Sequence, residues 1–462
     1  MSDVILDVWD GPAVAVHALT EAEAMAALEV DPFAVALAKT AEFKGKAGQV
    51  LLIPNAEGAL DRVLFGAGDA QHPTVFRALP ARLPAGVYRI AAQPDGITAD
   101  QIALYFALGS YRFDRYKTHD GERARLLVEG ANGAEVRQVA HACALARDMI
   151  NTPANDMGPL QIETIAREIA EQYGAQITVI EGDGLLEGNY PAVHAVGRAA
   201  DPARAPRMIE IGWSPPGGEA DKPLVCLIGK GVVFDTGGLD IKPSAGMRNM
   251  KKDRGGAAHV LALGRMIMAA RLPVRLAVLV PVVENAISGD AMRPGDVLAS
   301  RKGISIEVGN TDAEGRLILA DALTRACELA PALTLDMATL TGAARVALGP
   351  QLPPYFTDDE TLAAQIEAAA RAEWDPLWRL PLWKAYAEAL DSEVAEIKND
   401  PDGWAQAGAI TAALFLQRFA PKGPWVHLDI FAWNPRARPG WPAGGEAQAI
   451  RGLYRMIRER FA

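Results

Sequence analysis

The feature that most constrains the fold is a regular alternation of apolar, strand-like runs with helix-like segments from residue 160 onward. The strand-like runs cover residues 176–180, 207–211, 224–228, 276–282, 304–308, 333–337 and 426–430. Helical patterns cover residues 160–173, 257–270, 317–329, 362–372 and 407–419. Strands that alternate with helices imply a largely parallel sheet covered on both faces. We therefore predict an α/β fold with a mixed, largely parallel sheet for this part of the chain.

The first 120 residues also mix short apolar runs with helix-like stretches, separated by proline and glycine. A chain of 462 residues is too long for one ordinary domain. A long helical pattern from about Ala134 to Ile150 is broken by the segment 151–159, which contains two prolines. We therefore predict two domains: residues 1–150, a small α/β domain with a connecting helix, and residues 151–462, a larger α/β domain.

Composition excludes several classes of protein. The net charge of −11 argues against a general nucleic-acid or anionic-membrane partner. No apolar run is long enough for a membrane span, and the N-terminus lacks a signal-peptide pattern. The three cysteines lie far apart and form neither a disulfide framework nor a Cys-x-x-Cys site. Their arrangement predicts free thiols in a reducing compartment, and hence a cytoplasmic protein.

The most informative local stretch is Asn310-Thr-Asp-Ala-Glu-Gly-Arg-Leu317, in which Asp312, Glu314 and Arg316 recur at every second residue. In an extended segment these three side chains would leave one face. Two carboxylates beside a guanidinium suit metal ligands next to an anion site. Because a strand-like run precedes the octet and a helical run follows it, we place it at the carboxyl end of a strand. A polar turn that caps a helix explains the octet alone about equally well.

Two further stretches carry chemistry. Gly229-Lys-Gly-Val-Val-Phe-Asp-Thr-Gly-Gly-Leu-Asp-Ile-Lys-Pro243 follows an apolar strand, and its glycines let the backbone turn sharply and approach a ligand. A phosphate loop is disfavoured because Phe234 stands where a third glycine is needed. Met250-Lys-Lys-Asp-Arg-Gly-Gly-Ala-Ala258 places Asp253 before a helix that starts with glycine, where a helix cap is the simpler interpretation.

Other catalytic signatures are absent from the sequence: it has no His-Glu-x-x-His, no Gly-x-Ser-x-Gly and no Cys/His zinc spacing. His259 and His427 lie on apolar segments and are expected to be core histidines with satisfied hydrogen bonds. For Asp336 we favour a buried, hydrogen-bonded strand residue over a metal ligand.

Taken together, the three stretches resemble motifs of the leucyl aminopeptidase family, the two-metal M17 or cytosol aminopeptidases. The similarity is close from about Asn151 to Gly349 and looser elsewhere. It implies an N-terminal α/β domain of macro-domain type, a C-terminal metal-binding catalytic domain and a homohexamer. It also implies hydrolysis of N-terminal residues, leucine-like ones preferred, from peptides and amino-acid amides by a two-metal-activated water.

The resemblance assigns roles to ten residues. The implied metal ligands, of which Asp235 and Glu314 would bridge two ions, are Lys230, Asp235, Asp253, Asp312 and Glu314. Lys242 and Arg316 would be the catalytic pair that does not ligate metal, and Arg316 would hold a bicarbonate that acts as general base. Met250, Thr339 and Gly342 would line the pocket for the first substrate side chain, although ordinary packing also explains them.

Elementary electrostatics agrees with these roles. Four gathered carboxylates repel one another, and two divalent cations would neutralise them in number. A lysine ligand has to be a neutral amine, which burial and adjacent cations favour. Two ions about 3.5–4 Å apart can activate a shared water near neutral pH. Oxygen-rich ligation with one amine leaves zinc, manganese and magnesium open as the metal.

Two departures from the family pattern put details in doubt. Arg254 stands where we expect methionine, and its charge would weaken metal affinity unless the side chain points away. Residues 443–448 replace an expected Thr-Gly pattern near the substrate pocket. The alternative function is a catalytically weak or degenerate family member that acts as a scaffold or regulator. A further hypothesis, binding of ADP-ribose by the N-terminal domain, lacks a glycine-rich phosphate loop to support it.

Overall fold

The computed structural model describes residues 4–29, 31–69, 72–117, 121–217, 221–401 and 404–462. The chain divides into two compact units. The first comprises Met1–Ala144 and Pro435–Ala443, and the second comprises Leu145–Asn434 and Gly444–Ala462.

The first unit contains a six-stranded sheet that confirms the predicted small α/β domain. Its order is β1 (Ile5–Leu6), β6 (Ala124–Leu127), β5 (Gly86–Ala92), β2 (Val14–Thr20), β4 (Leu60–Gly68) and β3 (Val50–Pro54). All neighbouring strands are parallel except β3 and β4. Helices α1 (Glu21–Glu29) and α2 (Pro32–Thr40) bury alanine and leucine against β3 and β4, and α3 (Ala99–Gly109) begins with a capping box at Thr98.

The second unit is built on a nine-stranded sheet. Its main path is β16 (Trp378–Arg379), β15 (Pro354–Phe356), β18 (Trp425–Asp429), β14 (Leu333–Ala338), β9 (Leu224–Gly229), β11 (Arg275–Asn285), β8 (Arg207–Trp213) and β7 (Gln176–Glu181). A ninth strand, β10 (Gly231–Asp235), pairs with the end of β11. The central pairs β18–β14, β14–β9 and β9–β11 are parallel, whereas β7, β8 and β15 join antiparallel neighbours.

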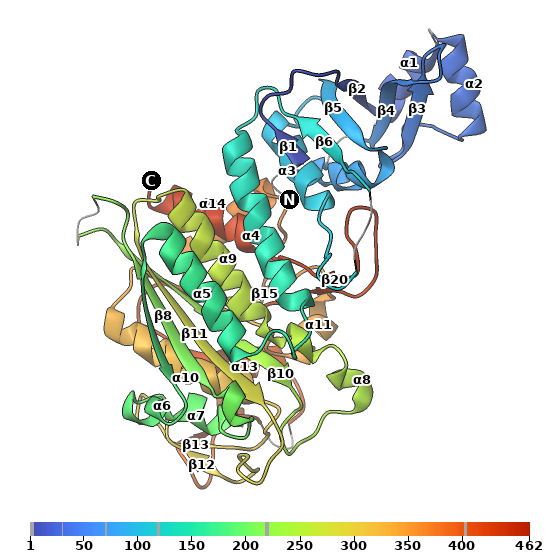
Figure 1. The fold of residues 1–462 in the computed structure, drawn as a ribbon. Helices are drawn as coiled ribbons and strands as arrows, with labels where there is room; N and C mark the ends of the chain where they lie inside the picture. The colour runs from blue at the N-terminus through green and yellow to red at the C-terminus, as the bar shows by residue number, and fades with distance from the viewer. Residues whose placement is uncertain (1–3, 30, 70–71, 118–120, 218–220, 402–403) are drawn as a thin grey trace. The chain divides into compact units, whose positions relative to one another are not determined.

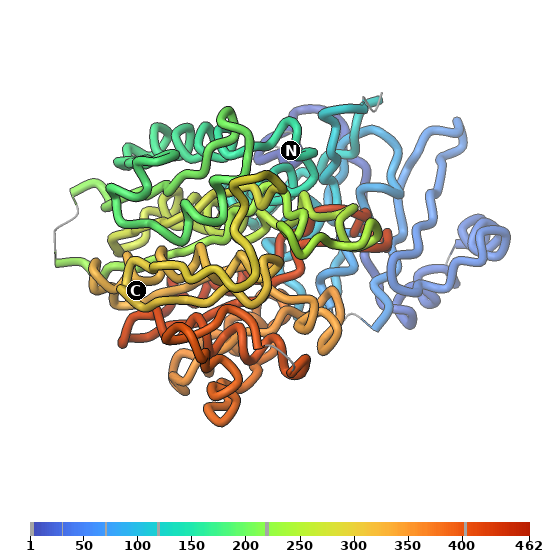
Figure 2. Tube along the Cα trace, turned by 90° about the horizontal axis from the view of Figure 1, so that it is seen from below, coloured from blue at the N-terminus to red at the C-terminus, as the bar shows by residue number. Residues whose placement is uncertain are grey.

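Helices cover both faces of this sheet, as predicted (Figure 1). One face carries α5 (Pro159–Tyr173) and α9 (Gly255–Ala269), and the opposite face carries α7 (Pro191–Gly197), α10 (Glu314–Leu329) and α13 (Gly408–Gln417). In the view from below, the green helix α5 and the orange-red helix α13 lie on opposite sides of the unit (Figure 2). The central strands are buried on both faces, which explains why their sequences are continuous apolar runs rather than alternating ones.

The remaining helices complete the outer layers. Helix α4 (Gly133–Asn151) spans the division between the two units. Helices α12 (Glu360–Ala372) and α14 (Ile450–Arg460) pack on each other, and α14 also contacts α9. Among the described residues, no helix combines the length and the apolar character needed to cross a bilayer.

Two predictions about the octet 310–317 are met only in part, because it follows a strand and precedes a helix, as expected, but the strand and the helix start differ from the prediction. The run 304–308 forms only a two-residue strand, β13 (Ile306–Glu307), in a separate small sheet with β12 (Val297–Leu298) and β17 (Ile397–Lys398). Helix α10 begins at Glu314, so Glu314 and Arg316 lie in its first turn rather than on one face of an extended segment. The octet therefore lies on a loop between a minor strand and a helix, not at the end of a strand of the main sheet.

Candidate metal centre

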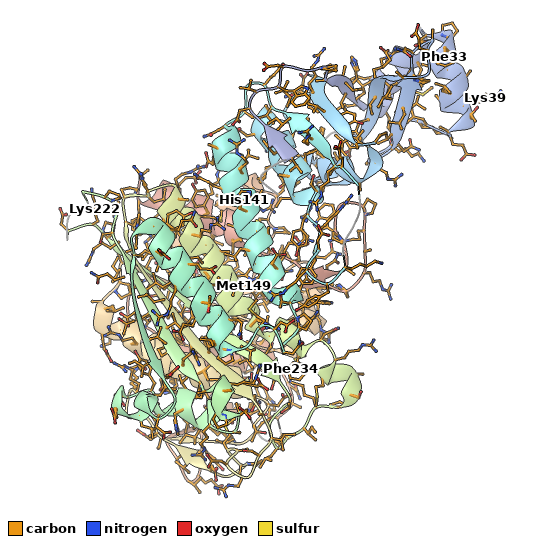
Figure 3. All side chains as sticks on the ribbon, in the orientation of Figure 1. Phe33, Lys39, His141, Met149, Lys222 and Phe234 are labelled. Carbon is orange, nitrogen blue, oxygen red and sulfur yellow. The ribbon has the colours of Figure 1, made fainter. Side chains whose placement is uncertain are left out.

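The three motifs converge at the carboxyl ends of the central strands. Lys230 follows β9, and Asp235 is the last residue of β10. Asp253 lies in the short 3-10 helix η5 (Met250–Arg254), which leads directly into α9. Asp312 and Glu314 come from the loop before α10 and from its first turn. Phe234, the residue that disfavours a phosphate loop, lies on β10 (Figure 3).

Lys230 lies between two of the buried acids, Asp253 and Glu314. Its Nζ is 2.7 Å from Asp253 Oδ2 and 2.8 Å from Glu314 Oε1, and it donates a hydrogen bond of 3.2 Å to Thr339 O. Although burial favours the neutral amine, the Asp253 and Glu314 carboxylates raise the pKa of Lys230 above its ordinary value. Gly315 makes room for this side chain, because a Cβ there would lie 2.6 Å from Lys230 Cε.

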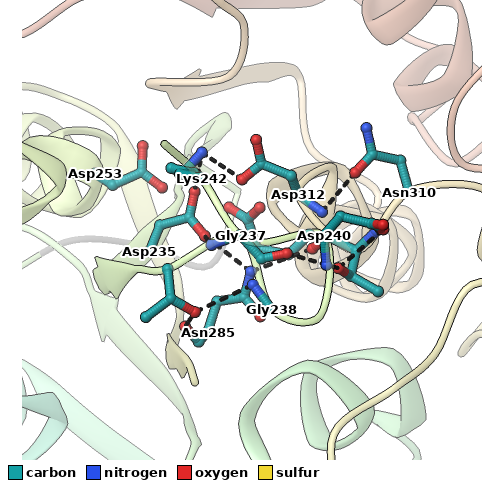
Figure 4. Close-up of polar contacts among 12 residues, drawn as sticks. Asp235, Gly237, Gly238, Asp240, Lys242, Asp253, Asn285, Asn310 and Asp312 are labelled. Atoms are coloured by element: carbon teal, nitrogen blue, oxygen red, sulfur yellow. Dashed lines mark hydrogen bonds and ion pairs between the residues drawn. The ribbon is translucent and has the colours of Figure 1, made fainter. Parts of the chain in front are cut away.

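Asp235 is held from two sides. Its Oδ1 accepts hydrogen bonds from Gly237 N at 2.9 Å and from Asn285 Nδ2 at 2.8 Å. Its Oδ2 lies 2.7 Å from Lys242 Nζ (Figure 4). Gly237 has a φ of +91°, a conformation that favours glycine and lets the chain fold back toward Lys242.

Lys242 forms ion pairs with the other two carboxylates, those of Asp235 and Asp312 (Figure 4). Burial opposes the charged form, but the carboxylates of Asp235 and Glu314 raise the pKa of Lys242 above its ordinary value. Lys242 is therefore a cation at neutral pH, positioned beside the acids.

Three of the acids approach closely enough to share an ion. One oxygen each of Asp235, Asp312 and Glu314 lies within 4.8 Å of the others. Burial, reinforced by the Asp235 carboxylate, raises the pKa of Asp312 to about 6 and that of Glu314 to about 8. Among the described residues, both Glu314 oxygens are buried without a hydrogen bond, although Oε1 is near the Lys230 ammonium. Oxygen donors that need positive charge and are poorly satisfied by the protein suit divalent cations.

Asp253 completes the set from the other side of Lys230. Its Oδ1 accepts a hydrogen bond of 2.8 Å from Thr339 Oγ1, and its side chain is buried. Burial alone would raise the pKa of Asp253, but the Lys230 ammonium lowers it below its ordinary value. The structure thus brings together all five residues that the sequence predicts as metal ligands.

Arg316 lies behind Glu314 in the first turn of α10. Its Nη1 donates a hydrogen bond to Asn399 O and lies 3.7 Å from Asp400 Oδ1. Burial lowers the pKa of Arg316 from its ordinary value. Among the described residues, Nε is buried and has no hydrogen-bond partner, so part of the guanidinium can still bind an anion.

The three residues predicted for the substrate pocket are less tightly connected to the acids. Thr339 follows β14 and contacts Asp253 directly. Met250 begins η5, three residues before Asp253, and is half-buried. Gly342 begins helix α11 (Gly342–Leu348) and has open space around the position of a Cβ. Within the described residues, no hydrogen bond or ion pair joins Met250 or Gly342 to the acids.

The Arg254 side chain points away from the acids. It is fully buried, and it donates hydrogen bonds to Lys251 O at 2.7 Å, to Thr152 O at 2.9 Å and to Met157 O. These contacts tie η5 to the loop that follows α4. The Arg254 side chain thus points away from the predicted ligands, which is the arrangement in which its charge is not expected to weaken metal affinity.

The altered 443–448 segment is anchored by Gln448. Its Oε1 accepts hydrogen bonds from Phe431 N and Ala432 N, and its backbone N donates to His259 Nε2 at 2.9 Å. His259 Nδ1 lies 2.6 Å from Gly255 O, so both ring nitrogens are satisfied in the neutral form, as predicted for a core histidine. Burial lowers the pKa of His259 to about 4.

The prediction for Asp336 is confirmed, because it is buried on β14 and accepts hydrogen bonds from Trp425 Nε1 at 2.7 Å and His427 Nδ1 at 2.5 Å. His427 only partly meets its prediction, since its Nε2 is buried without a partner among the described residues. None of the three cysteines, all of which lie among the described residues, forms a disulfide, as expected, and Cys143 and Cys226 are buried.

Sequence reasoning missed the polar residues that hold the predicted ligands in place. Asn285 ends β11 and bridges Asp235 to Thr311 O. Thr311 and Asp240 exchange hydrogen bonds, since Asp240 Oδ2 accepts from Thr311 N at 2.8 Å and Thr311 Oγ1 accepts from Asp240 N at 2.9 Å. A polar residue directly after a long apolar strand, as in Val-Val-Glu-Asn285, is the signal that points to such a role.

Comparison with known proteins agrees with this geometry. The sequence model of the cytosol aminopeptidase family, catalytic domain, matches residues 144–454, and that of the M17 aminopeptidase N-terminal domain matches residues 14–129. A probable cytosol aminopeptidase of Geobacter sp. (strain M21) is 37% identical over 92% of this chain and 91% of its own length.

Comparison with solved structures supports the same family. The cytosol aminopeptidase from Coxiella burnetii matches with a TM-score of 0.93 and 42% identity, and the match covers 99% of this chain and 100% of that one. The bottromycin maturation enzyme BotP in complex with Mn matches with a TM-score of 0.87 and 34% identity, over 98% and 100% of the two chains. The chain therefore belongs to the M17 cytosol aminopeptidase family of metallo-exopeptidases.

Proposed function

We propose that this aminopeptidase removes N-terminal residues from peptides and amino-acid amides at a centre of two divalent ions, and that leucine-like residues are preferred. The observation that carries the proposal is the gathering of four carboxylates and one lysine amine from three separate motifs around one buried point. The ligands would be Lys230, Asp235, Asp253, Asp312 and Glu314.

Two bound ions would supply Lewis-acid activation of water and of the substrate carbonyl. The protein's own groups supply the rest. The Lys242 ammonium lies beside the acids and can donate a hydrogen bond to the carbonyl oxygen as negative charge develops on it. Lys230 serves as a ligand only as a neutral amine, and cations bound among its carboxylate neighbours favour loss of its proton.

Arg316 is proposed as the residue that holds a bicarbonate, the general base of the reaction. Its Nε is buried and without a hydrogen-bond partner among the described residues, whereas Nη1 is fixed by Asn399 O. An anion bound at the free edge of this guanidinium would lie next to the first turn of α10, where the helix dipole also favours negative charge.

Manganese and zinc are the metals we propose, with magnesium as a third option, because oxygen donors with one amine do not select sharply among them. Met250, Thr339 and Gly342 are proposed to line the pocket for the N-terminal side chain. We also propose a homohexamer, and functional domains that correspond to residues 1–150 and 151–462.

Glu314→Gln tests the catalytic proposal. The variant should lose hydrolysis of leucine p-nitroanilide, because it removes a charged ligand while keeping the shape of the side chain. Glu328→Gln is the matched control, since Glu328 lies on the same helix with a partly exposed side chain that pairs with arginines. Its activity should stay within about twofold of the original. Undiminished activity of a folded Glu314→Gln variant would refute the role of Glu314.

The alternative, a degenerate family member that acts as a scaffold or regulator, makes the opposite prediction. It requires an incomplete ligand set, whereas all five positions are filled and gathered here. A panel of aminoacyl amides assayed with added manganese or zinc, before and after chelation, separates the two. Hydrolysis that chelation abolishes supports the peptidase, and a protein that binds metal but hydrolyses none of the amides supports the alternative.

A further inference from the structure

Asn399 is a buried residue far in sequence from the motifs, yet it contacts the backbone of the loop that carries Asp312. It directly follows β17, which pairs with β13, and its backbone N donates a hydrogen bond of 2.9 Å to Glu307 O. Its exposed fraction is 0%. The strand pairing therefore places the Asn399 side chain under the loop 309–313 that follows β13.

The side-chain amide of Asn399 uses its full hydrogen-bonding capacity on this loop. Its Oδ1 accepts from Gly309 N at 2.8 Å and from Asn310 N at 3.2 Å. Its Nδ2 donates to Asn310 O at 2.7 Å and to Ala313 O at 3.3 Å. One side chain thus joins four backbone groups on either side of Asp312. A carboxamide has two donors and two acceptor positions, so no hydroxyl or carboxylate reproduces this pattern.

The backbone of Asn399 also fixes Arg316, whose Nη1 donates to Asn399 O. The loop is braced from its other side by the Asp240 carboxylate, which accepts from Thr311 N and Thr311 Oγ1. The loop is therefore held between two supports, the buried Asn399 side chain and the exposed Asp240. The Asp240 support lies within a recognised motif, whereas Asn399 lies outside all three.

We propose that Asn399 is a positioning residue of the active centre: it fixes the loop 309–313, and through it the carboxylates of Asp312 and Glu314 and the guanidinium of Arg316. The inference rests on the proposed function in that Asp312 and Glu314 are taken as metal ligands. Groups that orient ligands through hydrogen bonds typically change metal affinity or activity by about 10–100-fold when they are removed.

The test compares Asn399→Ala with Asp321→Ala. Asp321 is a matched control because it is also fully buried, accepts hydrogen bonds from the backbone N atoms of Ala192, Val193 and Arg301, and lies on the same helix α10 as Glu314. Both variants lose several buried hydrogen bonds to backbone and should unfold more easily. Only Asn399→Ala should change the centre.

Three readouts separate positioning from stability. Calorimetric titration with MnCl₂ should show affinity for at least one ion lowered about 10-fold or more in Asn399→Ala. The kcat for leucine p-nitroanilide should fall about 10–100-fold, with KM within about threefold. Hydrogen exchange of the 309–313 amides should be faster while exchange of the central strands is unchanged. Asp321→Ala should match the original protein in metal affinity and kcat within about twofold.

A folded Asn399→Ala variant that binds manganese and turns over normally, with only a lower unfolding temperature, would overturn the inference. If the alanine variant does not fold, Asn399→Asp keeps the volume and places a carboxylate oxygen against Asn310 O and Ala313 O, and the same readouts apply. Absence of hydrolysis by the unmodified protein would instead count against the proposed function, and the metal titration would still decide the role of Asn399.

Discussion

Replacement of Arg254 by methionine tests whether this departure from the family pattern is structural or acts on the metal centre. The guanidinium is fully buried, and Nε, Nη1 and Nη2 each donate to a backbone carbonyl. In Arg254→Met the carbonyls of Lys251, Thr152 and Met157 lose these donors. An unsatisfied buried acceptor costs about 1–3 kcal/mol, and relief from burying a charge offsets part of the sum. We expect a net loss of about 3 kcal/mol in the stability of this region.

The matched control is Arg248→Met, which removes an exposed arginine six residues earlier in the chain. Its effect on stability should stay within about 0.5 kcal/mol. Arg254→Lys should be almost as harmful as Arg254→Met, because one ammonium cannot reproduce three donors held in a planar fork. Guanidinium unfolding gives the overall loss, and hydrogen exchange of the 151–157 amides shows whether the loop opens.

Metal affinity is the decisive second measurement. Because all three guanidinium nitrogens point to carbonyls away from the acids, Arg254→Met should change the affinity for Mn²⁺ by no more than about threefold. At an effective dielectric constant of about 20, an unscreened charge a few ångströms from a ligand would have a much larger effect. Unchanged stability together with a tenfold or greater rise in metal affinity would refute the structural interpretation.

Two other predictions follow from single side chains. Lys242→Met should lower kcat by about 10²–10³-fold with little change in KM, because Lys242 is placed to stabilise charge that develops in the transition state. A KM that changes by the same factor as kcat would contradict that role. His259 has a pKa lowered by burial from 6.5 to about 4, so the unfolded chain takes up its proton first and the folded protein loses stability as the pH falls below 6.5. Between pH 7.5 and 5 this term is about 2 kcal/mol, and His259→Gln should remove it from the pH dependence of guanidinium unfolding, whereas identical slopes would show that another group is responsible.

Much of the larger unit was predictable because its strands are long, apolar and buried on both faces. The runs at 224–228, 276–282 and 333–337 correspond to β9, β11 and β14, and the helices between them also form where expected. Strand β10 escaped prediction because its sequence is surrounded by glycine, and its pairing with β11 is a tertiary contact. The alternation Asp312, Glu314, Arg316 was misread for a related reason: spacing of two residues fits a strand, but the first turn of α10 tolerates it equally well.

The proposed ligands could be located from the sequence because each lies in a dense motif of glycines and charges. The residues that support them could not. Asn399 lies 89 residues from Asn310, and nothing local distinguishes it from a surface asparagine. The need for glycine at position 315 is likewise visible only in the structure, because the Lys230 side chain occupies the space that a Cβ would fill. Contacts between distant segments fix the geometry of the centre, and a single sequence does not display them.

The number of divalent ions bound per chain tests the central claim most directly. After saturation with manganese and removal of excess metal, elemental analysis should find two ions per chain, and a double variant in which Asp235 and Glu314 are both replaced by alanine should retain neither. A purified, folded protein that retains no ion, or whose two ions persist in that double variant, would contradict the account.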